Sequence, residues 1–199
     1  GRTRPSPELI AAKTAECRET LLRLERRMTE LERLGKELAK PKKMEKAFIK
    51  ELPAVVVASH RRVVRGYDEL FDLCPNVIGP EMARLGCESS EPGYCFTIDH
   101  TCEFRERDID IEYCEAVTER KEESELIEFK ELEAVPTAVC MYHRGNYGTL
   151  PQTFAELYAY VEKEGYKLAG SPRFSYIDGI WNKDSEEEWL TEIQIPAGR

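Results

Sequence analysis

The chain has 199 residues, which is enough for one large or two small domains with a real core. Hydrophobic residues make up 41% and charged residues 34% of the sequence, a balance that fits a globular part joined to a charged helical part. The net charge of −9 leaves no basic stripe and makes nucleic-acid binding by this chain alone unfavourable.

A long helix is predicted first, over residues 8–40. Pro7 suits the first turn of a helix, and Pro41 ends it. The apolar positions alternate in steps of four and three, with Glu, Arg and Lys around them, as in a coiled coil. This seam consists of Ile10, Thr14, Cys17, Leu21, Leu24, Met28, Leu31, Gly35 and Leu38. We expect a homodimer through residues 8–40 to cover the seam; the alternative is a helix that folds back onto its own globular domain.

A basic joint at 41–46 separates the helical segment, residues 1–44, from a globular domain, residues 45–199. The first half of this domain is predicted to hold two strand segments around Pro53, a helix that prolines interrupt, and two further strands. These elements fall at 47–63, 67–86, 93–99 and 104–117, and a charged link at 118–125 follows.

The second half has the same order of elements. A sheet-like run with a central proline precedes a helix, and a β-hairpin closes the chain. These elements fall at 126–145, 150–166, and 173–178 with 189–195.

The last strand alternates between two faces. Ile193 and Ile195 share a core face, so Glu192 points to the opposite one. A mid-strand carboxylate with Tyr176 and Trp181 nearby suits a cationic or amphipathic organic ligand. The alternative is a glutamate on the solvent-exposed face of an antiparallel sheet.

The two halves repeat each other, over about 45–118 and 125–197. Matched residues, each 80 positions apart, are Lys50 and Lys130, Tyr67 and Tyr147, and Glu112 and Glu192. A duplicated β-α-β-β unit of this kind predicts an α+β fold, with one antiparallel sheet and two helices on one of its faces. We expect the other face to curve into a groove on the pseudo-twofold axis, with Glu112 and Glu192 pointing into it.

Three segments resemble the GyrI-like small-molecule-binding domain, which is also the effector-binding domain of many bacterial regulators. They are KELPAVVVASHR, the Gly-Tyr at the start of the first-half helix, and PRFSYIDG followed by EEEWLTEIQIP. The resemblance covers roughly 46–196. The helix in front resembles the dimerisation helix of a MerR-type transcription regulator. In that family a winged-helix domain precedes the helix, so we expect DNA contact only through an N-terminal domain absent from this chain.

The resemblance implies a hydrophobic, often cationic, ligand in a central cleft between aromatic rings and an acidic group. Carried onto this chain, the acidic group is Glu192, and Tyr176 and Tyr147 are the aromatic contacts. Trp181 lies in the hairpin loop, where it lines or covers the cleft. The remaining candidates are Glu112, from the repeat, and the strand aromatics Phe96 and Tyr142.

The sequence therefore predicts the effector-sensing, dimerising part of a multidrug-type regulator. Seven cysteines without a CxxC pair indicate reduced thiols in the cytoplasm. Three scattered histidines and the lack of a long apolar run indicate no metal, no cofactor and no membrane contact.

Two other functions follow from the resemblance. One is a stand-alone hydrolase of reactive cyclopropane-type natural products, in which Glu192 or Glu112 activates water and Tyr147 steadies the leaving group. The other is an inhibitor that binds a topoisomerase, as acidic relatives do.

Overall fold

A computed structural model describes residues 6–39, 46–67, 69–101 and 107–199. The chain divides into two compact units, Gly1–Met44 and Glu45–Arg199. In its described part the first unit is one helix, α1 (Pro7–Ala39), with Glu8 in the first turn, where a carboxylate interacts favourably with the helix dipole. The predicted stop at Pro41 lies outside the described residues.

The seam of α1 faces solvent. Every seam residue from Ile10 to Leu31 is exposed, Leu24 by 51% and Leu31 by 61%. The side chains of Gly35 and Leu38 are outside the described part. An apolar stripe of this length gains stability when another surface covers it.

The first half of the second unit follows the predicted order. Its elements are β1 (Phe48–Leu52), β2 (Val55–Val64), α2 (Glu69–Leu73), η1 (Cys74–Ile78), α3 (Gly79–Arg84), β3 (Cys95–Asp99) and β4 (Ile109–Ala116). Pro53 separates β1 from β2, because proline cannot donate to a strand ladder. The prolines do not break the helical stretch into two parts as predicted: it continues from α2 to α3, with Pro75 in the π-type turn η1 and Pro80 in the first turn of α3, where a missing N–H costs no hydrogen bond. Of the strand predicted at 104–117, residues 104–106 lie outside the described part.

The second half adds one short strand that the sequence did not predict. Its elements are β5 (Glu128–Leu132), β6 (Val135–Arg144), η2 (Tyr147–Thr149), α4 (Leu150–Lys163), β7 (Lys167–Leu168), β8 (Arg173–Asp178), η3 (Glu186–Glu188) and β9 (Leu190–Gly198). Gly165 just after α4 has a φ of +76°, a value that glycine adopts without strain. The closing hairpin is confirmed, with Ser175 of β8 opposite Glu192 of β9.

The strands form one antiparallel sheet in the order β1-β6-β9-β8-β3-β4-β2-β5, with β7 paired to β9 outside this path. The two halves meet where β3 pairs with β8, around the opposed residues Phe96 and Ser175. Each half also gives its first strand to the other: β1 pairs with β6, and β5 pairs with β2. The predicted α+β class and duplicated unit are confirmed.

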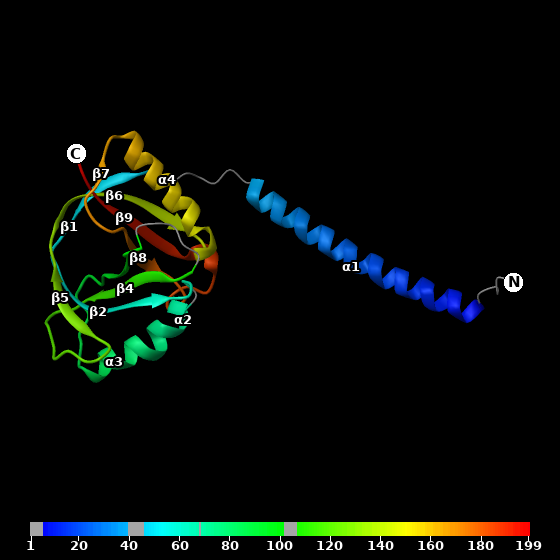
Figure 1. Ribbon diagram of the computed structural model, residues 1–199, viewed down its shortest axis with the longest axis horizontal. Coiled ribbons are helices and arrows are strands. Elements are labelled where there is room, and N and C mark those ends of the chain that lie inside the picture. The colour runs from blue at the N-terminus through cyan, green and yellow to red at the C-terminus, as the bar shows by residue number, and fades with distance from the viewer. Residues whose placement is uncertain (1–5, 40–45, 68, 102–106) are drawn as a thin grey trace. The chain divides into compact units, whose positions relative to one another are not determined.

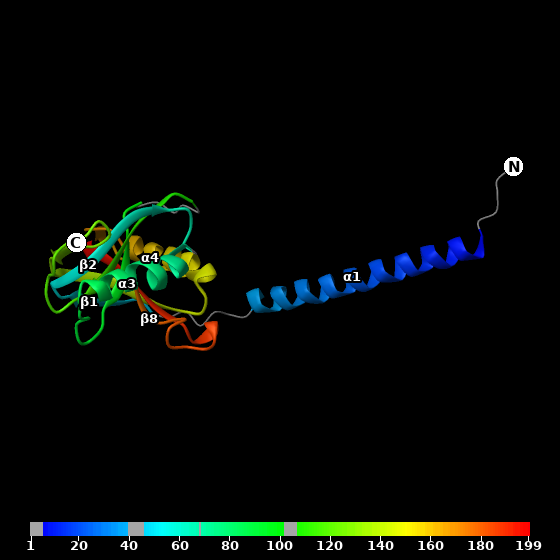
Figure 2. The same cartoon turned by 90° about the horizontal axis from the view of Figure 1, so that it is seen from below.

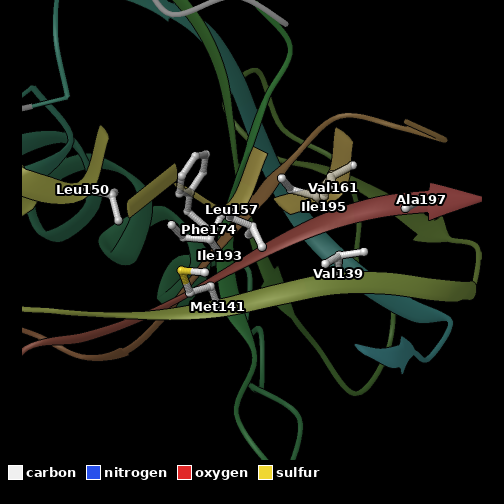
Figure 3. Packing of buried hydrophobic residues seen from close by; sticks show 9 residues of the cluster. All are labelled: Val139, Met141, Leu150, Leu157, Val161, Phe174, Ile193, Ile195 and Ala197. Atoms are coloured by element: carbon white, nitrogen blue, oxygen red, sulfur yellow. The ribbon is translucent and has the colours of Figure 1, made fainter. Parts of the chain in front are cut away.

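The helices of the second unit, α2, α3 and α4, lie on one face of its sheet, as predicted (Figure 1). Leu157 and Val161 of α4 pack against Val139, Ile193 and Ile195 of β6 and β9, and Figure 3 shows this cluster. Leu73, Ile78 and Met82, from α2 to α3, pack over Ala58 of β2. On this one face, α4 thus lies over β6 and β9 and the α2–α3 segment lies over β2, with the central strands β3 and β8 between them.

The helix-free face does not form the groove that the sequence predicted. The sheet is strongly curved, and β1 and β5 come to the same side of the domain (Figure 1). Side chains on this face fill the inside of the curve: Val57, Phe96, Cys114 and Cys140 have no exposed surface. Curvature has closed the space in which the groove was expected.

Within the described part of the chain, each helix is either too short or too polar to serve as a membrane span. Figure 2 shows the second unit from below, with α3 nearest the viewer.

Candidate functional site

A large cleft opens on the helix-bearing face, between the α2–η1 segment and α4. Its volume is about 1420 Å³. Cys95, Thr97 and Asp99 of β3 and Phe174 and Tyr176 of β8 form part of its floor. The cleft thus lies over the junction of the two halves, where side chains of alternate residues in each strand point toward the helices.

Aromatic rings form most of the cleft wall. Tyr147 contacts three other rings: Phe71 at 5.4 Å, Tyr176 edge-on at 5.7 Å and Trp189 at 4.9 Å between centroids. Phe154 of α4 lies 5.7 Å from Phe174. The aromatic lining residues are Tyr67, Phe71, Tyr94, Tyr113, Tyr147, Phe154, Tyr158, Phe174, Tyr176 and Trp181. Rings of this number offer apolar area and cation–π contact to an organic guest.

The charged groups of the cleft are all acidic. Asp99, Glu115 and Glu162 line it, and no Lys, Arg or His is among the described residues that do so. Asp99 accepts hydrogen bonds from the Tyr67 hydroxyl (2.9 Å) and from the backbone N–H of Thr101 (2.8 Å). Glu115 accepts from the hydroxyls of Tyr113 (2.7 Å) and Ser89. The cleft therefore presents negative charge with apolar rings around it, which favours cationic guests.

The phenols and thiols of the cleft are held in their neutral forms. Burial raises the pKa of Tyr147 to about 12 and that of the Cys74 thiol to about 11. Burial, reinforced by the charge of Asp99, raises the pKa of Tyr67. The pKa of Tyr176 is also raised, mainly by burial, and its hydroxyl is 2.9 Å from Oγ1 of Thr97. Neither the phenols nor the thiols add charge to the cleft near neutral pH.

The structure brings three of the predicted site residues to this cleft. Tyr147 and Tyr176 touch each other at one end, and Trp181 lines the cleft from the β8–β9 turn. Trp181 is 58% exposed, which fits a position at the rim.

The other predicted residues lie outside the lining. Glu192 and Glu112 point to the helix-free face, because their neighbours Ile193 and Ile111 face the helices. Each glutamate is buried and forms a salt bridge with a lysine: Glu192 with Lys50, and Glu112 with Lys130.

These two ion pairs are counterparts in the repeat. In each, a lysine from the first strand of one half neutralises a glutamate in the last strand of the other half. Further partners are Gln194, whose amide donates to Glu192 (2.7 Å), and His100, whose Nε2 lies 2.8 Å from Glu112. The carboxylates thus stabilise the framework.

Phe96 and Tyr142 also lie away from the cleft. Phe96 is fully buried on the helix-free face, where its ring stacks on Tyr94 (4.2 Å) and lies under the guanidinium of Arg173 (5.3 Å). Tyr142 packs on Phe48 of the edge strand β1 at 5.1 Å. Both rings contribute to packing.

Sequence reasoning missed Asp99, Glu115, Tyr67 and Phe71 as cleft residues. The repeat pairs Tyr67 with Tyr147, which was a signal for its role. Tyr113 and Glu115 share a face of β4 through simple alternation, but Glu112 drew attention instead because it has a counterpart in the second half. For Phe71, no sequence pattern distinguished a cleft residue from a core one.

The described residues also show how the acidic and metal-ligating side chains are grouped. They contain no group of three or more His, Cys, Asp and Glu side chains placed to hold a metal ion. The hydrolase alternative required Glu192 or Glu112 beside Tyr147, yet only Tyr147 lines the cleft.

An aromatic, acidic cleft between two repeated halves defines a domain that binds small organic molecules. The chain belongs to the GyrI-like small molecule binding domain family, whose model matches residues 46–197. A comparison with curated proteins gave no match.

Solved structures agree with this assignment. The crystal structure of the EcmrR C-terminal domain has 40% sequence identity and a TM-score of 0.74, and the match covers 78% of this chain and 98% of that chain. A cryo-EM structure of an EcmrR–DNA complex has 34% identity and a TM-score of 0.76, and the match covers 98% of this chain and 73% of that chain. A hydrolase from Listeria innocua has 15% identity and a TM-score of 0.52, over 82% of this chain and 96% of that chain, a likeness that shows the fold alone.

Proposed function

We propose that this chain is the effector-sensing and dimerising part of a MerR-type transcription regulator in the cytoplasm. The cleft binds hydrophobic organic cations, with Tyr147, Tyr176 and Trp181 as aromatic contacts and Asp99 or Glu115 as the counter-charge. The observation that carries the proposal is the lining itself: many rings, three carboxylates and no basic side chain among its described residues.

The regulator role is supported by the similarity to EcmrR. The match to the EcmrR–DNA complex covers 98% of this chain, and so extends over α1 as well as the binding domain. A net charge of −9 makes these residues unsuited to touch DNA, so we assign DNA contact to a further domain. Ligand binding then acts by favouring one arrangement of two copies over another.

A dye titration tests the binding function. We expect wild type to bind a rhodamine-type cationic dye at micromolar levels, measured by fluorescence anisotropy. Glu115→Gln should weaken binding roughly tenfold, which is about 1.4 kcal/mol, because it removes a half-buried charge from the cleft. Trp181→Ala should weaken it roughly three- to tenfold through loss of a ring.

Glu192→Gln is the matched control, since it removes the same charge from the other face. It should leave dye affinity unchanged but lower the free energy of unfolding by about 1–3 kcal/mol, because it breaks the ion pair with Lys50. The cost of breaking a fully buried pair is about 3–5 kcal/mol, and Lys50 is 39% exposed, which reduces it. Loss of dye binding in Glu192→Gln, with Glu115→Gln unaffected, would place the site on the helix-free face and refute the proposal.

A further inference from the structure

Two half-buried carboxylates stand far apart in the cleft. Glu115 is directly across from Cys95 in the ladder of β3 and β4, whereas Asp99 lies four residues further along β3, opposite Ile111. At about 3.3 Å per residue, roughly 13 Å separate the two positions along the strand. A compact cation in contact with one carboxylate therefore cannot touch the other.

Among the described residues, neither carboxylate has a basic partner. The hydrogen bonds that Asp99 and Glu115 accept there come from hydroxyl and backbone N–H groups, and no described Lys, Arg or His forms a salt bridge with either. Glu112 and Glu192 differ, because a lysine neutralises each of them. The cleft thus has two uncompensated negative charges, which is the arrangement that two separate cationic groups would neutralise.

The space between the two charges is open and aromatic. A volume of about 1420 Å³ exceeds the roughly 300–1,000 Å³ of most small-molecule sites. Tyr67 stands beside Asp99, and the Tyr176 hydroxyl meets Thr97 midway along β3. On one side α4 lines the cleft from Leu150 to Glu162, about 18 Å of helix. The exposed carboxylate of Glu162 adds negative charge at the rim.

We propose that the preferred guests of this cleft are elongated dications: organic molecules with an apolar spacer and a cationic group near each end. One cationic group lies against Asp99 and the other against Glu115, and the spacer lies along the rings of Tyr67 and Tyr176. This inference rests on the proposed binding function and specifies its ligand class.

Competition with the dye tests the ligand class on the wild-type chain. The probes are bis(trimethylammonium)alkanes of increasing spacer length, each compared with the alkyltrimethylammonium monocation of the same chain length. We expect affinity to peak at one spacer length, at which the dication binds at least tenfold more tightly than its monocation. Equal affinity of dications and monocations at every length overturns the proposal, and failure of the dye itself to bind overturns the proposed function instead.

Two variants then test the assigned contacts. Asp99→Asn and Glu115→Gln still accept the tyrosine hydroxyl bonds, and each should abolish the dication's advantage. Only one of the two substitutions should lower the affinity for the monocation. Glu131→Gln, an exposed residue of β5 outside the cleft, is the matched charge control and should change nothing. If each cleft substitution lowers the affinities for monocation and dication by the same factor, the two-site assignment is wrong. Spacer dependence in wild type remains decisive even if a variant fails to fold.

Discussion

Several tyrosine phenols among the described residues are buried and have raised pKa values. Burial raises the pKa of Tyr67, Tyr113 and Tyr176, and nearby negative groups add to the effect at Tyr67 and Tyr113. Burial likewise raises the pKa of Tyr147 to about 12. Each phenol therefore resists ionisation in the folded state, although it ionises near pH 10 in the unfolded chain.

Alkaline destabilisation follows from this difference. The raised folded-state pKa values contribute stability that is fully present below about pH 10 and is lost as pH rises toward about 12. Each such tyrosine contributes up to about 1.4 kcal/mol per pH unit in that window. Urea unfolding at successive pH values should show a flat free energy of unfolding up to about pH 9 and a steep decline above pH 10. The decline should be less steep in Tyr67→Phe; an identical decline would show that other groups cause it.

The turn between β8 and β9 positions the indole ring of Trp181 at the rim of the cleft. The Asn182 side chain closes this turn by accepting from the backbone N–H of Gly179 (2.9 Å) and donating to Asp178 (2.8 Å). The ring of Trp181 then folds over Gly179, where a Cβ would lie only 2.3 Å from it. Glycine is required here for the ring's position, not for an unusual backbone conformation.

Gly179→Ala should therefore move Trp181 without unfolding the domain. We expect dye affinity to fall roughly three- to tenfold, as in Trp181→Ala, because the ring leaves the rim. In a Trp189→Phe background, Trp181 is the single tryptophan, and its emission should shift on the Gly179→Ala substitution. Unchanged emission and unchanged dye affinity would show that the ring tolerates a Cβ beneath it and that the glycine has no such role.

Helix α1 carries the second element-scale prediction, that of a dimer. Its seam is exposed, and burial of a leucine side chain in a partner helix gains on the order of 2 kcal/mol. Sedimentation should show a dimer for the chain and a monomer for Leu24→Asp. Leu22→Asp is the matched control: Leu22 is 56% exposed, like Leu24, but lies off the seam, so the dimer should persist. A monomeric wild type contradicts the prediction.

At the scale of the whole molecule, the halves are joined by more than a shared edge. Three pairs of strands cross between them: β1 with β6, β2 with β5, and β3 with β8. The buried ion pairs Lys50–Glu192 and Lys130–Glu112 cross in the same way. Neither half can complete its hydrogen-bonded sheet without the other.

Cleavage of the link between the halves tests this exchange. A protease site inserted between the exposed residues Glu122 and Glu123 should allow complete cutting of the chain. The two fragments should still co-elute in gel filtration and bind dye, because each supplies a strand to the other. Separation of the fragments into independently folded species would contradict the exchange.

Local chemistry made much of this fold predictable, but the curvature of the sheet, which decides which face is open, could not be predicted. Pro53 separated two strands as predicted, because proline acts on its own backbone, whereas the helical run from α2 to α3 continues through Pro75 and Pro80. Alternation placed Glu192 on the face opposite Ile193, also correctly. Which face would be open depends on how far the sheet curls and on what fills the curve, and no single segment encodes this. The cleft therefore lies on the face that Glu115 shares with Tyr113 and not on the face of Glu192.

The exchanged outer strands also bear on how the protein is made. During synthesis β1 leaves the ribosome long before β6, its partner in the sheet, and until then both edges of β1 lack a strand. Lys50 must wait for Glu192, which follows it by 142 residues (192 − 50) and lies in β9. The first half can therefore only collapse loosely while translation continues, and the sheet closes after its last strand has emerged. The unpaired edges of this sheet therefore have the greatest need of protection from aggregation just before β9 emerges.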